Sequence, residues 1–195
     1  MGRPVSVAVT GGIGAGKSEA LQAFNRHGAA VVSSDEIVHR LLAEDADVRA
    51  ALRERLGEEV FDGVGRVVWS RVAELVFGDP GLRAWLEQLL HPRVMREYLA
   101  WSEEQAGKRT PPALTVAEVP LLYETGGDTR FDRVVVITAP LTVRAERHPV
   151  QDEREARLLP DEEKVQRADY AYVNDGSLEE LDRFVAEVVE GLSSR

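Results

Sequence analysis

A glycine-rich string near the N-terminus constrains this chain more than any other feature. Residues 11–18 read Gly-Gly-Ile-Gly-Ala-Gly-Lys-Ser, which is the complete pattern G-x-x-x-x-G-K-[ST]. Residues 5–10 before it are small and β-branched, as in a buried strand, and residues 19–27 after it carry Leu21 and Phe24 at helical spacing. A strand-to-helix turn is the context that distinguishes a phosphate-binding loop from an ordinary flexible turn. The string therefore predicts a site for ATP or GTP.

The residue types of this loop predict how it would hold a nucleotide. Gly11 and Gly16 allow backbone angles that a side chain would forbid, so backbone N–H groups can approach phosphate oxygens at the positive end of the following helix. Lys17 is expected to reach the β- and γ-phosphates, and the hydroxyl of Ser18 is expected to bind Mg²⁺. The residues expected to bind the nucleotide here are Gly11, Gly12, Gly14, Ala15, Gly16, Lys17, Ser18 and Glu19.

The composition argues against several classes of protein. A formal net charge of −10 argues against a nucleic-acid surface, because binding to a phosphate backbone needs basic stripes. The absence of cysteine excludes disulfides, thiolate metal sites and a cysteine nucleophile. No apolar run approaches the roughly 20 residues of a membrane span, and residues 5–9 lead straight into the loop without the core of a signal peptide. We therefore expect a cytoplasmic protein without membrane partners.

The pattern along the chain predicts an α/β fold with a five-stranded parallel sheet flanked by helices. Short apolar segments predict strands at 5–10, 29–33, 113–117, 134–137 and 170–173. The length of 195 residues suits one domain with an inserted subdomain. The predicted parts are a core of 1–44, 113–140 and 168–195, a helical insertion of 45–112 and a charged lid of 141–167. Within the insertion, His91 and Pro92 are expected to begin a helix.

Polar side chains are expected where strands end, because ligands bind at the carboxyl edge of an open α/β sheet. Asp35 follows the second strand and suits a base that deprotonates an attacking hydroxyl, although Asp35 or Ser34 would serve equally well as a helix cap. Glu118 ends the third strand, either as a Walker-B acid near magnesium or as an ordinary loop carboxylate. Asn174 ends the fifth strand and either bonds a purine edge or forms a plain turn.

The charged stretch of the predicted lid contains arginines that suit two roles. They can clamp nucleotide phosphates when a lid closes, or they can form a solvated face, as most charge runs do. These residues are Arg144, Arg147, Arg154 and Arg157.

Taken together, these segments resemble the dephospho-CoA kinase family over nearly the whole chain. The phosphate loop is common to many kinases, but residues 86–92 (Leu-Glu-Gln-Leu-Leu-His-Pro) and 119–124 (Val-Pro-Leu-Leu-Tyr-Glu) are far more particular at this separation. Further matches are Asp35, Asp62-Gly63 followed by Arg71, and Ala168-Asp169 followed by Asn174.

The resemblance implies a P-loop kinase fold with a nucleotide-binding core, a helical acceptor-binding region and a lid. It implies that ATP with Mg²⁺ phosphorylates the ribose 3′-hydroxyl of dephospho-CoA. We expect the protein to be a monomer or small homo-oligomer. Asp35 is then the base, and Lys17, Arg147 and Arg154 act on the transferred phosphate. The acceptor-binding residues implied by the resemblance are Asp35, Arg71, His91, Leu121, Tyr123 and Glu124.

Three departures from the family pattern affect these expectations. Ser33-Ser34-Asp35 stands where Asp-Ala-Asp is usual, which leaves Asp35 as the remaining acid. Glu19 replaces a customary Thr, so it keeps the backbone N–H but places a like charge near the α-phosphate. The lid is shorter, lacks one Arg and has Leu158 where Gln is usual, so it offers fewer groups for a phosphate clamp.

Two alternatives stay open at this point. Another small-molecule P-loop kinase, for a nucleoside monophosphate or a sugar acid, would share the loop, the lid and the helical insertion. A nucleotide-dependent regulatory module is the alternative from another class. Switch GTPases need an Asn-Lys-x-Asp string and an Asp-x-x-Gly string after a strand, and neither occurs in a convincing context.

Overall fold

The structure is a computed structural model that describes residues 3–147 and 158–194. It consists of two compact units. The core unit comprises Met1–Ser33 and Trp101–Arg195, and the helical unit comprises Ser34–Ala100. The insertion predicted over 45–112 overlaps the helical unit but has different limits.

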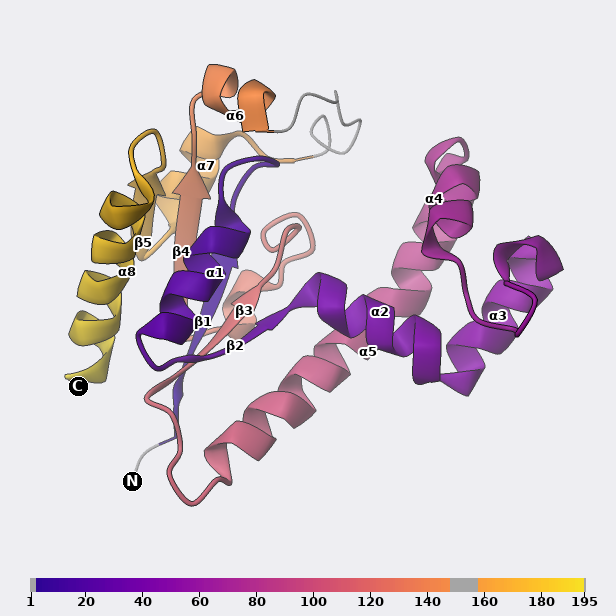
Figure 1. Ribbon diagram of the computed structural model, residues 1–195, viewed down its shortest axis with the longest axis horizontal. Coiled ribbons are helices and arrows are strands. Elements are labelled where there is room, and N and C mark those ends of the chain that lie inside the picture. Colours follow the sequence, from indigo (N-terminus) through magenta and orange to yellow (C-terminus); the bar gives the residue numbers. More distant parts are fainter. Residues whose placement is uncertain (1–2, 148–157, 195) are drawn as a thin grey trace. The chain divides into compact units, whose positions relative to one another are not determined.

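The core unit is built on a parallel sheet of five strands, as predicted (Figure 1). The strands are β1 (Val5–Thr10), β2 (Ala30–Ser33), β3 (Leu114–Glu118), β4 (Arg133–Thr138) and β5 (Tyr170–Val173). Their order is β2-β3-β1-β4-β5, and every neighbouring pair is parallel. Because β1 is central, the loop that follows it emerges between the carboxyl ends of β3 and β4, where ligands bind in such sheets.

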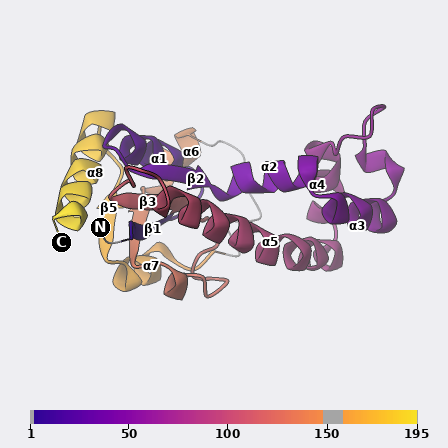
Figure 2. The same ribbon diagram turned by 90° about the horizontal axis from the view of Figure 1, so that it is seen from below.

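Helices cover both faces of this sheet. The helices of the core unit are α1 (Lys17–Arg26), α6 (Leu141–Arg147), α7 (Asp161–Arg167) and α8 (Leu178–Ser193). Alternate residues of β1 point to opposite faces, so Val7 and Val9 pack with α1 and α8 while Ala8 packs with Leu122 and Tyr123. In Figure 2 the sheet lies between α1 on one side and α7 on the other. The phosphate loop is thus attached to a strand buried on both faces.

The last helix of the chain begins at a Ser-x-x-Glu string, residues 177–180. The side chain of Ser177 accepts a hydrogen bond from the Glu180 backbone N–H, and the Glu180 side chain accepts one from the Ser177 backbone, which completes a capping box. Leu181, Val185 and Val188 are buried on one face of α8. This face fixes α8 against the sheet next to β5.

The helical unit consists of α2 (Ser34–Glu44), α3 (Ala46–Leu56), α4 (Trp69–Phe77) and most of α5 (Pro80–Ala106). Asp45 caps α3, since its Oδ1 accepts from the backbone N–H groups of Asp47 and Val48 at 2.9 and 3.0 Å. Gly57 ends α3 with a positive φ of 85°. In the parts of the chain that the structure describes, no helix is both long enough and apolar enough to cross a membrane.

The prediction that His91 and Pro92 begin a helix is wrong, because both lie inside α5. Pro92 has no N–H to donate to the carbonyl four residues earlier, and its ring crowds the preceding turn. In that turn the Nη1 of Arg93 donates to the carbonyl oxygen of Leu89 at 2.8 Å. Arg93 thus adds a side-chain hydrogen bond in the turn that Pro92 disturbs. Helix α5 continues past Pro92 to Ala106.

Candidate active site

The phosphate loop has backbone angles that its glycines make possible. Gly11 and Gly16 have φ values of 144° and 98°, in the region that L-residues rarely adopt. A Cβ atom at Gly11 would run into the carbonyl oxygen of Ile137 in β4, and one at Gly16 would run into the side-chain amide of Asn174. The loop therefore lies directly against the carboxyl ends of two strands, with backbone in the places that side chains would occupy.

Lys17 begins α1 and lies across the loop that precedes it. Lys17 is 9% exposed, and its Nζ donates to the carbonyl oxygen of Gly12 at 2.9 Å. The preceding Gly16 has no side chain with which to cap α1, so the positive end of the helix faces the loop without a competing side-chain acceptor. An ammonium group and helical N–H groups together make a place that favours an anion.

Ser18 and Glu118 meet at the end of the sheet. Glu118 is the last residue of β3, pairs in register with Val9 of β1 and is 8% exposed. Its Oε2 lies 3.4 Å from the Oγ of Ser18. Glu118 is thus a strand residue beside the loop rather than an ordinary loop carboxylate. Two oxygens of these kinds fit Mg²⁺, which is usually held by one or two protein oxygens, waters and substrate phosphates.

Asn174 braces the loop from the end of β5. Asn174 is 3% exposed, and its Nδ2 donates to the carbonyl oxygen of Ala15 at 2.8 Å. The Nη1 of Arg147, at the end of α6, donates in turn to the backbone carbonyl of Asn174 at 3.1 Å. Sequence reasoning missed this brace, because nothing local to Asn174 signals a partner 159 residues away. Asn174 is therefore more than part of a plain turn.

Arg144, one of the four arginines of the charged stretch, is buried against the loop. Its Nε donates to the carbonyl oxygen of Ala139 at 2.8 Å, and its guanidinium forms an ion pair with Asp161 of α7. A Cβ atom at Gly12 would collide with this guanidinium. The solvated-face interpretation is therefore wrong for Arg144, whereas Arg147 is exposed. The other two, Arg154 and Arg157, lie outside the described residues.

The segment after β3 contacts the second half of the predicted lid. Tyr123 is 5% exposed, and its burial raises the pKa of the phenol to about 12, although the nearby Arg167 acts in the opposite direction. The guanidinium of Arg167 lies 4.2 Å from the centroid of the Tyr123 ring. Glu124 accepts from the backbone N–H of Leu159 at 2.8 Å, while Leu121 is half-buried. Residues predicted to line the acceptor site thus also hold the lid.

The helical unit carries the other predicted acceptor residues. Helix α2 begins at Ser34, so Ser34 and Asp35 lie in its first turn rather than at its N-cap. Asp35 is exposed, and its negative charge is favoured at this end of the helix. His91 is exposed on α5. Asp35 and His91 therefore both present their side chains to solvent, where a ligand can reach them.

Arg71 and Asp62 have structural contacts of their own. The Nη1 of Arg71 donates to the carbonyl oxygens of Glu59 and Phe61 at 3.0 and 2.7 Å. Asp62 accepts backbone hydrogen bonds, above all from Arg66, and these hold the pKa of its carboxyl below the usual value. The two residues therefore stabilise the turn before α4, in addition to any contact with a substrate.

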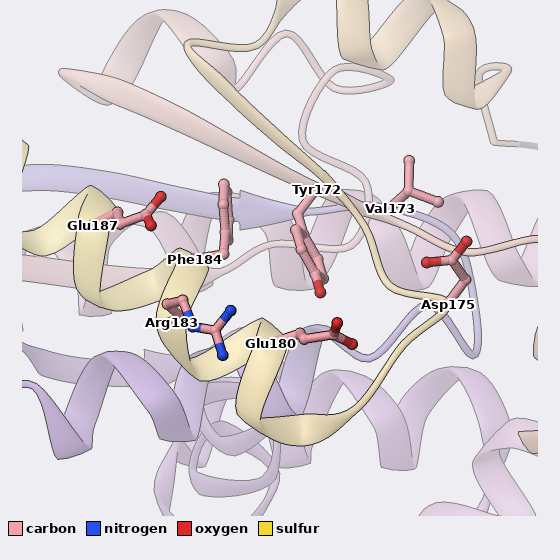
Figure 3. Close-up of a pocket in the computed structure, with 7 residues that line it drawn as sticks. All are labelled: Tyr172, Val173, Asp175, Glu180, Arg183, Phe184 and Glu187. Carbon is pink, nitrogen blue, oxygen red and sulfur yellow. The ribbon is translucent and has the colours of Figure 1, made fainter.

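A surface pocket lies between β5 and α8 (Figure 3). The rings of Tyr172 and Phe184 stack there with centroids 4.8 Å apart. Burial, with the charges of Glu180 and Asp175, raises the pKa of the Tyr172 phenol. The carboxylates around this pocket repel phosphates, so the pocket differs from the phosphate loop in the charge of the ligand that it favours. Its lining residues are Tyr172, Val173, Asp175, Glu180, Arg183, Phe184 and Glu187.

Comparisons with known proteins agree with this geometry. The family model described as dephospho-CoA kinase matches residues 5–180. A dephospho-CoA kinase of Protochlamydia amoebophila is 35% identical over 194 residues, which cover 95% of each chain. One of Chlamydia abortus is 37% identical over 193 residues, which cover 94% of each chain. Both relatives are therefore matched along almost their entire length.

Solved structures resemble the chain in the same way. The structure of TT1252 from Thermus thermophilus is 32% identical, covers 98% of this chain and 99% of that chain, and has a TM-score of 0.71. A dephospho-CoA kinase from Campylobacter jejuni, 22% identical with 97% of each chain covered and a TM-score of 0.72, shares the fold. Because the family match includes the formed phosphate loop and extends over nine-tenths of the sequence, the chain belongs to the dephospho-CoA kinase family.

Proposed function

We propose that this chain transfers the γ-phosphoryl group of ATP to the ribose 3′-hydroxyl of dephospho-CoA, which gives coenzyme A. The observation that carries the proposal is the family match over residues 5–180, in a chain whose phosphate loop is completely formed. A protein with the loop alone would be a nucleotide binder of unspecified activity. The match extends far beyond the loop, over residues 5–180, and therefore supports dephospho-CoA as the acceptor.

The core unit supplies the groups for the phosphate side of the reaction. When bound, ATP supplies the phosphoryl group and Mg²⁺ neutralises charge on its phosphates. Lys17 and the backbone N–H groups of residues 11–19 would hold the β- and γ-phosphates, and Ser18 with Glu118 would supply oxygens to the metal. Arg147 and Arg154 would add positive charge from the lid, although Arg154 lies outside the described residues. These groups act by stabilising charge in the transition state.

Asp35 is the proposed base. Its exposed carboxylate would accept the proton of the 3′-hydroxyl while the new O–P bond forms and the bond between the γ-phosphorus and the bridging oxygen breaks. Arg71, His91 and Leu121 are proposed to hold the rest of dephospho-CoA. We also propose that the protein acts in the cytoplasm as a monomer or small homo-oligomer.

An acceptor comparison tests the proposal. Initial rates are measured with dephospho-CoA, AMP, shikimate and gluconate at equal concentration and with excess Mg-ATP. Dephospho-CoA should be the best acceptor, because binding energy from its pantetheine arm helps to position the reacting hydroxyl, and AMP lacks that arm. More efficient phosphorylation of any of the other three would refute the acceptor and favour another small-molecule kinase. ATP binding without transfer to any acceptor would favour a regulatory module.

A further inference from the structure

Lys164 is a fully buried lysine in a segment that is otherwise strongly charged. It lies on the short helix α7, and its side chain is 0% exposed. Its Nζ lies 3.0 Å from the Oε1 of Glu124, whose side chain is 12% exposed. Lysine is almost never fully buried unless it is paired, because removing its charge from water is costly. Because burying this ammonium group is costly, we expect Lys164 to have a role beyond packing.

The two carboxylate oxygens of Glu124 have different surroundings. Oε1 accepts from the Leu159 backbone N–H at 2.8 Å and pairs with Lys164. Oε2 is buried and has no hydrogen-bond partner among the described residues, and the same is true of the hydroxyl of neighbouring Tyr123. A buried polar atom without a partner costs about 1–3 kcal/mol. Two of them side by side in the chain mark a place where a ligand's polar groups would complete the bonding.

Helix α7 connects this place to the phosphate loop. Asp161, Lys164 and Arg167 are spaced by three residues, so they share one face of the helix. Asp161 pairs with Arg144, which lies against the phosphate loop, and Arg167 pairs with Asp128 at 3.0 Å. Lys164 lies between these two attachments and holds Glu124. The same face of α7 therefore contacts Arg144, which lies against the phosphate loop, and Glu124, which belongs to the segment predicted to hold the acceptor.

We propose that Lys164 is a positioning residue for phosphoryl transfer and that it acts through Glu124. The ion pair engages Oε1, fixes the Glu124 side chain and leaves Oε2 to accept a hydrogen bond from the bound acceptor. The pair also keeps α7 seated, so that Asp161 holds Arg144 at the loop. This inference rests on the proposed function, because it assigns the acceptor of that reaction to Oε2.

A double-mutant cycle tests the coupling. The variants are Lys164→Met, Glu124→Gln and the combination of the two, with Lys108→Met as a matched control on an exposed lysine. Each single variant should raise the KM for dephospho-CoA about 10-fold, the size expected for one hydrogen bond to a charged group. The combination should be no worse than Glu124→Gln alone, instead of showing the roughly 100-fold product expected of independent residues. The KM for ATP should stay within twofold.

Thermal unfolding separates positioning from folding. Lys164→Met leaves a buried carboxylate unpaired and should lower the Tm, whereas the combined variant removes both charges and should regain most of that loss. Rates are measured well below the lowest Tm. If the pair serves folding alone, the KM for dephospho-CoA recovers together with the Tm in the combined variant. If Lys164 positions Glu124, the Tm recovers and the KM stays high.

The outcomes distinguish the two proposals. The role of Lys164 is overturned if the increases in KM of the two single variants multiply in the combination. It is also overturned if Lys164→Met has a wild-type KM for dephospho-CoA. Both results leave the proposed function intact. A wild-type protein that does not phosphorylate dephospho-CoA refutes the proposed function, and the role of Lys164 with it. If Lys164→Met does not fold, Lys164→Arg keeps the charge but shifts its partner, and a wild-type KM in that variant overturns the positioning role.

Discussion

Replacing Lys17 by Met removes one ammonium group from the phosphate loop and keeps most of the aliphatic stem. In the structure Lys17 is 9% exposed and its ammonium group donates to the Gly12 carbonyl oxygen at 2.9 Å, so the substitution has two separate effects. The loop loses a hydrogen bond from a charged donor, worth about 1.5–3 kcal/mol of stability. With about 2–4 °C of Tm for each kcal/mol in a chain of this size, we expect a Tm lower by about 3–12 °C.

The catalytic effect of the same substitution should be larger. Losing one preorganised donor to developing charge costs about 2.7–4 kcal/mol, which is about 10²–10³ in kcat. The assay is single-turnover transfer from Mg-ATP to dephospho-CoA, below the Tm of the variant and with Lys108→Met as the control of equal charge. A kcat within threefold of the wild type would refute the assignment of Lys17 to the transferred phosphate. An unchanged Tm would refute only the stabilising effect of the hydrogen bond from Lys17 to the Gly12 carbonyl oxygen.

Three further predictions concern other parts of the core unit and the acceptor side. Asp35→Asn should lower kcat by about 10²–10⁴ and leave ATP affinity unchanged in calorimetric titration, and a near-normal kcat would exclude Asp35 as the base. Asn174→Ala should weaken ATP binding and lower the Tm by a few degrees, since the Ala15 carbonyl loses its buried donor; unchanged ATP binding would contradict the brace. Burial raises the pKa of Asp132, but hydrogen bonds, above all from Arg3, bring it below its ordinary value of 3.8, so its contribution to stability is present above about pH 4 and lost as the pH falls further. The Tm measured from pH 7 to pH 3 should therefore fall less steeply in Asp132→Asn, and identical slopes would count against this role.

The parts of the fold that the sequence predicts are those whose cause is local. Five strands are found within a residue or two of their predicted limits, because buried parallel strands need continuous apolar segments such as 134–137. The loop at 11–18 can also be found locally, since glycines at 11, 14 and 16 permit the positive φ values that the structure shows. The capping box at Ser177 and Glu180 is local too, because it involves only four consecutive residues.

What the sequence does not predict depends on partners far along the chain. His91 and Pro92 read as the start of a helix, and only the surrounding turns of α5 show that it continues. Lys164 lies in a stretch whose charge predicts exposure, and its burial depends on Glu124, 40 residues earlier in the sequence. Periodicity assigns a lysine to the surface by default, so a buried one cannot be found from its own segment.

The glycines of the phosphate loop show how a local sequence pattern and contacts with distant parts of the chain act on the same residues. Gly11 admits the backbone of β4, Gly12 admits the Arg144 guanidinium and Gly16 admits the Asn174 amide, so each lacks a side chain where another element needs the space. The usual explanation, that glycines let phosphate approach, accounts for one side of the loop. On its other side the same residues let α6 and two strand ends pack against it. The loop's shape is therefore imposed by the end of a rigid sheet, which is how a short flexible sequence can hold its N–H groups in place before a nucleotide arrives.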